Sequence, residues 1–465
     1  MNSSLIFQLF LFFVSLSFCG EISACAFAAS PIAKNIVLMI SDGCGYNHVS
    51  AARLFAGSGS GGDILERFPY RCGMSTSSAH GSYDPAKAWE SFDYVKSGAT
   101  DSAAAATAMS TGAKTCSGAV GMGIDQRPLL HLLEHAETLG KATGIVTTVP
   151  WSHATPAGFI AHNADRENYE QIAIEIINTS KADVIMGCGH PAYGRNGESL
   201  IISASHKYVG GRSIWKALKN GTAGGDSDGD NTPDPWTLVE GREEFRSLMS
   251  GPTPKRVLGV AKVALTLQQE RDGDEYAIPC KAPFVQTVPT LAEMTRAALN
   301  VIDNDPDGFV LVVEGGAVDW ASHKNQPGRM IEEQSDFFRA VEAVVEYVER
   351  FSNWEKTSLI VTSDHECGYL TGPGSGFINN LPIWKPVVDN GAGILPGMEW
   401  HSADHTNSLV PVFVKGEAGK LVIRYADQYD TIIGPYIDNA EFARIILEAL
   451  EPGLKAHPKR RTVSD

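Results

Sequence analysis

The amino-acid sequence predicts an α/β fold with a doubly wound, mostly parallel central sheet and helices on both faces. Continuous Val/Ile/Leu runs of strand length recur along the chain, as expected for strands that are buried on both faces. Helical patterns lie between these runs, which is the alternation of a doubly wound sandwich. Polar or charged residues follow several runs, and ligands bind at that edge of such a sheet.

The predicted elements follow from these patterns in chain order. The apolar runs occupy residues 35–40, 143–149, 309–313, 358–362 and 409–414. Helical patterns occupy residues 129–139, 168–178, 291–302 and 330–351. Four of the strands end beside acidic, histidine or threonine side chains. A helix cap explains one such residue, whereas four together predict a site at the carboxyl edge of the sheet.

The length of 465 residues can bury a large core, and we expect a single domain over residues 29–465. Two segments of this domain have the composition of insertions. Residues from about 187 to 281 are rich in Gly, Asp, Pro and Asn, and residues 377–400 are loop-like with several Pro and Gly. Loops of that length are usually functional or cover an edge or an interface.

Residues 1–28 are predicted to be a signal peptide. Leu5–Phe18 is an apolar run of suitable length and Ala26-Phe27-Ala28 fits a cleavage site, although no positive side chain precedes the run. Ile22-Ser23-Ala24-Cys25 also resembles a lipoprotein box, so a lipoprotein leader that ends before Cys25 is an alternative, and a retained membrane anchor is another. We therefore expect an exported protein, periplasmic or secreted, with a membrane-anchored lipoprotein as the alternative.

The net charge of −16 argues against a nucleic-acid-binding surface. Six cysteines remain after the leader: Cys44, Cys72, Cys116, Cys188, Cys280 and Cys367. Their spacing forms no recognisable disulfide framework, and the lack of a CxxC pair argues against a thiolate metal site. Cys44 and Cys367 lie two residues from candidate metal ligands, and we interpret both as packing residues.

The run from Ala99 to Thr107 predicts a helix with a hydroxyl at its start. Asp101 and Ser102 suit an N-cap, and the alanines that follow favour helix without filling space. The Ser102 hydroxyl would lie beside unpaired backbone N–H groups and the positive end of the helix dipole, where an anion is stabilised. The run therefore fits a nucleophile that becomes an anionic ester, or else a capped, buried alanine helix.

Asp and His side chains recur with metal-ligand spacing: Asp319 with His323, Asp364 with His365, and His405. The first pair lies on one face of a helical turn, five residues after the strand-end Glu314. An exposed pair of this kind is common by itself, but its position at a strand end favours a metal site. Zinc and other divalent ions take these imidazole and carboxylate ligands. A nucleophilic serine with two Asp/His sites indicates two-metal phosphoryl transfer.

These residues belong to motifs that match a known family. In chain order the motifs are Ser41-Asp42-Gly43, Thr100-Asp101-Ser102-Ala103-Ala104, Ser110-Thr111-Gly112-Ala113-Lys114-Thr115, His153-Ala154-Thr155-Pro156, Arg166 within Asn163–Tyr169, Glu314-Gly315-Gly316 leading to Asp319 and His323, Thr362-Ser363-Asp364-His365, and His405-Thr406. In number and order they resemble the alkaline phosphatases over nearly all of the mature chain. The resemblance implies that family's fold, hydrolysis of phosphate monoesters, and a homodimer.

The resemblance also implies roles for the site residues. Ser102 resembles the nucleophile that becomes phosphoserine, and Arg166 would bind two non-bridging phosphate oxygens with its planar fork. Three metal ions are implied, with ligands as follows: Asp319, His323 and His405 for a first Zn²⁺, Asp42, Asp364 and His365 for a second Zn²⁺, and Asp42, Glu314 and Thr155 for Mg²⁺. The first zinc ion would activate water and stabilise the leaving alkoxide, and the second would lower the pKa of the Ser102 hydroxyl.

Two positions depart from the best-known bacterial pattern of this family. His153 stands where many members have an aspartate that holds magnesium waters, and Trp320 stands where they have a lysine that reaches the phosphate through water. We expect His153 to act on the third ion through water. The loss of a cation near the phosphate should weaken product binding, and product release often limits turnover.

One motif lies outside the family pattern. Residues 226–234 resemble a calcium loop with acids at positions 1, 3, 5 and 9, which are Asp226, Asp228, Asp230 and Asp234. The loop lacks the usual Gly at position 6, and Thr237 stands at position 12 in place of Glu. A bound Ca²⁺ and a solvated acidic loop both remain open.

Other activities of the same superfamily are less consistent with the sequence. Sulfatases need Cys or Ser followed by Pro and Arg, which the run after Ser102 lacks, and diesterases commonly use threonine and lack the equivalent of Arg166. A non-catalytic phosphate- or metal-binding protein is a further alternative, but every expected ligand is present. The leading hypothesis is a phosphomonoesterase with a broad range of small substrates, because only the phosphate would be bound.

Overall fold

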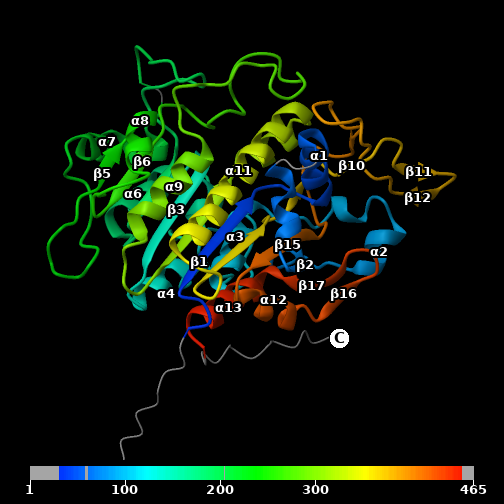
Figure 1. The fold of residues 1–465 in the computed structure, drawn as a ribbon, viewed down its shortest axis with the longest axis horizontal. Helices are drawn as coiled ribbons and strands as arrows, with labels where there is room; N and C mark the ends of the chain where they lie inside the picture. Colours follow the sequence, from blue (N-terminus) through cyan, green and yellow to red (C-terminus); the bar gives the residue numbers. More distant parts are fainter. Residues whose placement is uncertain (1–30, 58–60, 204, 453–465) are drawn as a thin grey trace, which may run out of the picture.

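The computed structural model describes residues 31–57, 61–203 and 205–452, so the predicted leader and Cys25 lie outside the described residues. One 11-stranded sheet runs through the molecule, with helices on both sides (Figure 1). In spatial order its strands are β16 (Gln428–Asp430), β17 (Gly434–Asp438), β2 (Tyr70–Ser75), β15 (Val410–Lys415), β8 (Thr357–Thr362), β1 (Asn35–Ser41), β7 (Phe309–Gly315), β3 (Ala142–Pro150), β4 (Val184–Cys188), β6 (Val257–Val260) and β5 (Thr237–Val239).

The sheet is mostly parallel, because only β15 and β16 among these strands run against the others. Each predicted apolar run forms one of its strands: β1, β3, β7, β8 or β15. The predicted fold class is therefore confirmed. Among the described residues, no helix is both long enough and apolar enough to cross a membrane.

Alternate residues of β1 enter two separate hydrophobic cores. Ile36, Leu38 and Ile40 pack in one core, and Val37 and Met39 pack in the other. Both faces of a strand in the middle of the sheet are thus buried, which explains its unbroken apolar sequence.

The two cores are covered by different helices (Figure 1). The core that contains Val37 is covered by α1 (Tyr46–Ala56), α8 (Arg242–Ser247), α9 (Leu291–Ile302), α10 (Ala317–His323) and α11 (Pro327–Phe351). The core that contains Ile36 is covered by α3 (Ser102–Thr111), α4 (Leu132–Thr138), α5 (Ala154–Ala157), α6 (Tyr169–Thr179), α7 (Gly211–Lys219), α12 (Ala418–Tyr425) and α13 (Asn439–Leu450). The predicted helices correspond to α4, α6, α9 and α11.

The segment expected to be an insertion near residues 187–281 supplies two strands of the main sheet. β6 pairs with β4 and β5 pairs with β6, both in parallel. The same segment forms α7 and α8, which pack on opposite faces of the sheet. It therefore extends the sheet by ordinary α/β units as well as forming loops.

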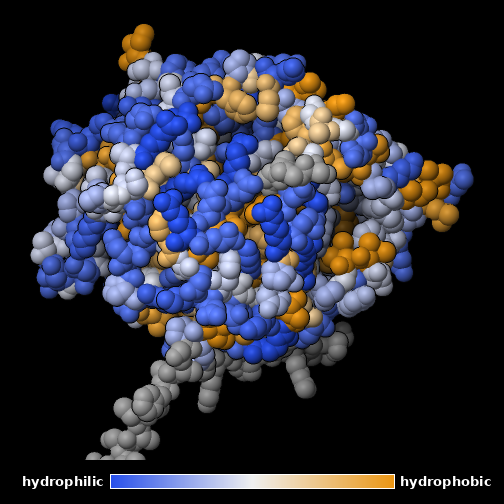
Figure 2. All heavy atoms as spheres, viewed as in Figure 1, coloured by the Kyte–Doolittle hydropathy of each residue, from blue (hydrophilic) through white to orange (hydrophobic). Residues whose placement is uncertain are grey.

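The second such segment, residues 377–400, contains most of a small hairpin. β11 (Gly376–Ile378) pairs with β12 (Leu381–Ile383) and projects at one end of the molecule (Figure 1). Phe377 is 53% exposed and Leu381 is 66% exposed, and Figure 2 shows apolar surface at this end. β13 (Glu399–Trp400) pairs with β10 (Leu370–Thr371) and brings the segment back towards the sheet.

Glu333 of α11 should make the stability of the fold depend on pH. Its side chain is buried, and burial, with Asp336 and Glu332 nearby, raises the pKa of Glu333 from 4.5 to about 8. The raised pKa contributes stability that is fully present below about pH 4.5 and is lost as the pH rises through about 8. We expect Glu333→Gln to melt on the order of 5 °C above the wild type at pH 9, and the gap to close near pH 5, by calorimetry. A gap that does not change with pH would contradict this assignment.

Candidate active site

Ser102 is the first residue of α3, and Asp101 caps the helix by accepting a hydrogen bond from the backbone N–H of Ala104 at 3.0 Å. The helix is buried along most of its length, and Ser102 itself is only 2% exposed. Small side chains are required here, because a Cβ at Gly158 would lie 2.6 Å from the Cβ of Ala106. The alanine run thus lets the segment after α5 pack closely against the helix that carries Ser102.

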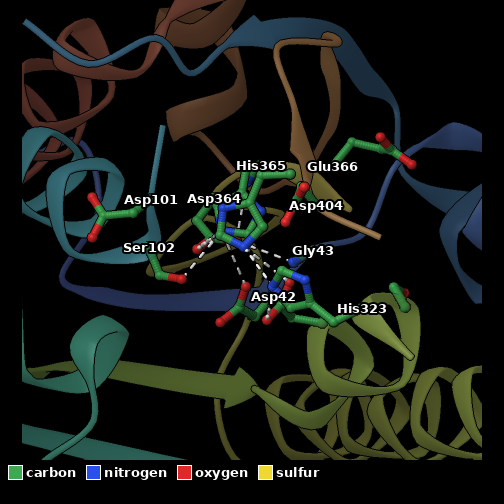
Figure 3. Close-up of polar contacts among 12 residues, drawn as sticks. Asp42, Gly43, Asp101, Ser102, His323, Asp364, His365, Glu366 and Asp404 are labelled. Atoms are coloured by element: carbon green, nitrogen blue, oxygen red, sulfur yellow. Dashed lines mark hydrogen bonds and ion pairs between the residues drawn. The ribbon is translucent and has the colours of Figure 1, made fainter. Parts of the chain in front are cut away.

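The neighbouring parallel strands β8, β1 and β7 bring acidic residues to one edge of the sheet. Ile40 is paired with Thr362 on one side and with Glu314 on the other, so Asp42 and Asp364 follow strand ends that lie side by side. Figure 3 shows Ser102, Asp42 and His365 directed towards one point. The polar strand ends that the sequence placed at this edge therefore lie side by side in the structure.

The first group consists of Asp319, His323 and His405. The Nδ1 atom of His323 donates to the carbonyl of Ala403 at 2.6 Å, and that of His405 donates to the carbonyl of Thr100 at 2.8 Å. Both Nε2 atoms are thereby turned towards Asp319, at 3.4 Å from Oδ2 and 3.3 Å from Oδ1. Carbonyl acceptors behind imidazoles are the usual second layer of a metal site.

The second group consists of Asp42, Asp364 and His365. The Nε2 atom of His365 lies 3.5 Å from Asp42 Oδ1, 3.2 Å from Asp364 Oδ2 and 3.1 Å from Ser102 Oγ. Asp364 Oδ1 is held by the backbone N–H groups of Gly43 and His365, at 3.2 and 3.0 Å. The nucleophile candidate therefore lies directly against this group.

A third group surrounds the other oxygen of Asp42. Thr155 Oγ1 donates to Asp42 Oδ2 at 3.3 Å. Glu314 is held by a hydrogen bond from Thr147 Oγ1, whose oxygen accepts in turn from the backbone N–H of Val149 at 3.1 Å. The structure thus brings all eight predicted metal ligands to the same edge of the sheet.

The buried carboxylates of the site favour the binding of cations. Burial and Asp364 raise the pKa of Asp42 well above its usual range, and burial raises the pKa of Asp364 to about 6 and that of Glu314 to about 8. Burial would also raise the pKa of Asp319, but His405 and His323 hold it below its ordinary value. One buried oxygen on each of these four carboxylates forms no hydrogen bond within the described part of the chain. Divalent ions would satisfy these oxygens.

Arg166 lies at the edge of the same site. Its Nη1 donates to Asp101 Oδ2 at 2.9 Å, and its backbone N–H donates to the carbonyl of Gly118 at 2.8 Å. Asp101 Oδ2 also accepts from the backbone N–H of Gly118 at 3.0 Å. Asp101 therefore caps the Ser102 helix, as the sequence predicts, and also holds Arg166, which the sequence did not predict.

Arg166 and Ser102 line an open depression of about 590 Å³, together with His153, Trp320 and His405. The rings of His153 and Trp320 lie 5.5 Å apart, and Tyr169 lies 5.8 Å from His153 on a nearly parallel plane. Burial and Arg166 lower the pKa of His153 to about 3, so this imidazole is neutral at ordinary pH. His153 is therefore an uncharged part of the lining of the depression, beside the three groups of ligands.

Cys367, interpreted from the sequence as a packing residue, lies beside the first group of ligands. β9 (Glu366–Cys367) pairs with β14 (His405–Thr406), which places Cys367 opposite His405. Its Sγ lies within 4.8 Å of ligand atoms of Asp319, His323 and His405. Burial raises the pKa of the Cys367 thiol well above its ordinary value.

Three of the four acids of the predicted calcium loop lie close together. Carboxylate oxygens of Asp226, Asp228 and Asp230 lie within 4.8 Å of one another, but all three residues are exposed. Asp234 is not in this group, and its Oδ1 pairs with Lys255 Nζ at 2.8 Å. The same ammonium group lies 2.8 Å from Asp228.

Comparison with known proteins points to one family. A sequence model described as alkaline phosphatase matches residues 33–385. Alkaline phosphatase 3 of Bacillus subtilis is 29% identical over 357 residues, which cover 74% of this chain and 64% of that protein, so the match spans less than two thirds of its length. Alkaline phosphatase of Escherichia coli is 29% identical over 422 residues, which cover 86% of this chain and 84% of that protein.

Solved structures agree in fold. The cold-active alkaline phosphatase from a psychrophilic Shewanella species is 23% identical, covers 90% of this chain and 99% of its own, and has a TM-score of 0.63. Alkaline phosphatase from Thermus thermophilus is 22% identical, covers 91% of this chain and 92% of its own, and has a TM-score of 0.61. Because the family match extends over most of the chain, the protein belongs to the alkaline phosphatase family.

Proposed function

We propose that the protein hydrolyses a broad range of phosphate monoesters through a phosphoserine intermediate at Ser102, with two Zn²⁺ and one Mg²⁺. The position of Ser102 Oγ carries the proposal. It lies at the start of α3, 3.1 Å from His365 Nε2, in a depression that Arg166 also lines. Four buried carboxylates surround His365 and its neighbours, which is a donor set for several cations.

The donor chemistry fits these ions. Imidazole nitrogens with carboxylates suit zinc, and an all-oxygen set suits magnesium. The proposed sets are Asp319, His323 and His405 for one Zn²⁺, Asp42, Asp364 and His365 for the other, and Asp42, Glu314 and Thr155 for Mg²⁺. When bound, such ions supply Lewis-acid stabilisation of the oxygens that attack and leave.

Side chains of the protein bind the phosphate group and form the covalent intermediate with it. The guanidinium of Arg166 would bind two non-bridging oxygens, while Asp101 holds it in place. Ser102 Oγ gives up its proton and forms a bond to phosphorus as the bond between phosphorus and the substrate oxygen breaks, and the leaving oxygen takes up a proton to become the alcohol. Water then attacks phosphorus, the bond to Ser102 Oγ breaks, and a proton from this water restores the hydroxyl. The backbone N–H groups and the dipole at the start of α3 stabilise the anionic ester. Because the depression is open, few side chains contact the alcohol portion of the substrate, which favours a broad range of substrates.

A direct comparison of substrates tests the proposal. The purified enzyme is assayed at alkaline pH on an aryl phosphate monoester and on the matching diester, with and without a chelator. We expect monoester hydrolysis to dominate by at least about 100-fold in kcat/KM, since a diester has one fewer charged oxygen for Arg166. Equal or higher diesterase activity would replace this proposal with the diesterase alternative, and no hydrolysis of either would favour a non-catalytic phosphate-binding protein.

Trp320→Lys should tighten the binding of inorganic phosphate. Trp320 is uncharged and lies beside the neutral His153, so neither side chain adds a positive charge to the depression. A lysine there would attract the product, and we expect the inhibition constant of phosphate to fall by about 5- to 10-fold, with a lower kcat if release limits turnover. Trp320→Phe is the matched control and should leave inhibition close to the wild-type value. Unchanged inhibition in the lysine variant would count against this account.

We also propose that the protein is exported and forms a homodimer. The apolar run at Leu5–Phe18 with the small residues at Ala26–Ala28 supports export, and a lipid on Cys25 is the alternative anchor. The exposed apolar side chains of the β11–β12 hairpin support a protein contact. Intact mass of the mature protein and light scattering after size exclusion test these two points.

A further inference from the structure

A pair of stacked histidines, His131 and His162, lies among residues that the active site does not use. His131 is the N-cap residue of α4, and His162 follows α5. Their ring centroids are 4.1 Å apart with an interplanar angle of 29°. His131 is completely buried, and His162 is largely buried. Because both rings can be protonated, the charge that they carry in this close contact has to be established.

Both nitrogens of His131 face oxygen acceptors. Nε2 lies 3.0 Å from the carbonyl of Ala161, to which it donates. Nδ1 lies 2.9 Å from Glu134 Oε2, yet it forms no hydrogen bond within the described residues. A neutral imidazole has one N–H, and the Ala161 carbonyl takes it. The Nδ1 lone pair of a neutral His131 would therefore face a carboxylate.

His162 has the same arrangement with different partners. Nδ1 lies 3.0 Å from Glu175 Oε1, and Nε2 lies 2.9 Å from the carbonyl of Leu129. Nε2 is also 3.9 Å from Glu134 Oε2. Because a neutral ring can donate to only one of these oxygens, one contact needs an added positive charge. Glu175 is the stronger acceptor and fixes the N–H at Nδ1.

We propose that His131 Nδ1, Glu134 Oε2 and His162 Nε2, with the carbonyl oxygen of Leu129, bind one divalent transition-metal ion. Protons could satisfy the same acceptors only by making two imidazolium rings 4.1 Å apart, which repel each other. One divalent ion supplies both charges at a single point between the rings. The Ala161 carbonyl and the Glu175 carboxylate behind the rings are the second-layer partners that metal-bound histidines use.

The distances suit a small ion. With bonds of about 2.0–2.1 Å, ligand atoms in a tetrahedral arrangement lie about 3.3–3.4 Å apart. The measured separations of 2.9, 3.9 and 2.9 Å between these atoms bracket that value. Two imidazole nitrogens with two oxygens favour zinc, cobalt or nickel over calcium or magnesium. The Glu134 side chain is 39% exposed, so an ion can reach the site from solvent.

The ion would stabilise the position of the chain segment that leads to Arg166, relative to the start of α4. Asn163, next to His162, exchanges two backbone hydrogen bonds with Val120, at 2.8 and 2.9 Å. These segments pack closely together: a Cβ at Gly121 would lie 2.3 Å from the carbonyl oxygen of Ala161 and 2.5 Å from His131 Nε2. A metal here would tie the start of α4 to the segment that leads to Arg166, outside the catalytic groups.

Metal counting on the intact enzyme tests the proposal. Wild type, His131→Gln and Glu134→Gln are saturated with Zn²⁺ and Mg²⁺ at pH 8, freed of unbound ions and analysed for metal per chain. His135→Gln is the matched control, since His135 lies on the same helix but pairs with Glu451. We expect the two site variants to hold one transition-metal ion fewer than the wild type and than His135→Gln. With Co²⁺, the difference spectrum between wild type and His131→Gln should contain the visible bands of a tetrahedral ion.

Activity separates this site from the catalytic one. Both site variants should retain hydrolysis of an aryl phosphate monoester under saturating metal, and their melting temperatures should rise less on addition of Zn²⁺ than that of the wild type. Glu134→Gln keeps an oxygen for the backbone N–H of His131 and is therefore the variant to use if His131→Gln does not fold. Equal metal content in Glu134→Gln, His135→Gln and wild type would overturn the proposal and assign the pair to protonated histidines instead.

Discussion

Ser102→Ala should lower kcat for an aryl phosphate monoester by about 10⁴-fold or more, which is the loss typical of a deleted nucleophile. The expectation rests on position: Ser102 is buried at the start of α3, and its Oγ faces the group formed by Asp42, Asp364 and His365. The side chain is small and buried among alanines, so the substitution should leave the melting temperature almost unchanged. Metal content should also stay at the wild-type value.

Ser117→Ala is the matched control for this prediction. Ser117 lines the same depression but is exposed and lies outside the three ligand groups. It should retain activity within a few-fold of the wild type. Acid quenching during turnover, followed by intact-mass analysis, should detect a phosphorylated chain in the wild type and none in Ser102→Ala. Residual activity of Ser102→Ala near the wild-type value would remove Ser102 from the mechanism.

Removal of the divalent ions should have the second large effect. Asp42, Glu314, Asp319 and Asp364 are buried side by side, and cations are the groups that would offset their mutual repulsion. A chelator should therefore reduce kcat/KM by about 10³-fold or more. Each ion held at about 1,000 times its dissociation constant stabilises the fold by about 4 kcal/mol, so the melting temperature should fall by on the order of 10 °C.

Adding the metal ions back one at a time distinguishes the contribution of the zinc sites from that of the magnesium site. Zn²⁺ added to the chelated enzyme should restore most of the activity, and Mg²⁺ added afterwards should increase it further, because Asp42 links the second and third groups. Calorimetry and a monoester assay on the same samples measure both quantities. A chelated enzyme with unchanged melting temperature and activity would contradict the metal assignments.

The sequence predicted the centre of the molecule better than its edges. β1, β7 and β8 are unbroken apolar runs whose polar ends lie on the same edge, so their pairing and their ligands follow from one pattern. α9 has the predicted bounds of Leu291–Ile302, because Thr290 and Glu293 form a capping box at its start. Local signals of this kind need no knowledge of distant contacts.

Contacts between residues far apart in the sequence could not be predicted from it. β5 is only three residues long and is defined by its pairing with β6, so a loop-like composition concealed it. Asp234 fits a calcium loop by spacing, and its contact with Lys255, 21 residues away in sequence, does not follow from that motif. Cys367 reached the site through the pairing of two very short strands. No local pattern specifies which partner such short segments choose.

The alternation of β1 between two cores has a practical consequence. A strand that serves both cores cannot separate from the sheet unless helices on both faces also separate, so its amides should exchange with solvent only when the whole molecule opens. Asp42 follows that strand directly. Loss of the catalytic geometry by heat should then coincide with loss of the folded molecule, and residual activity after a heat pulse would report the surviving folded fraction in a mutant library.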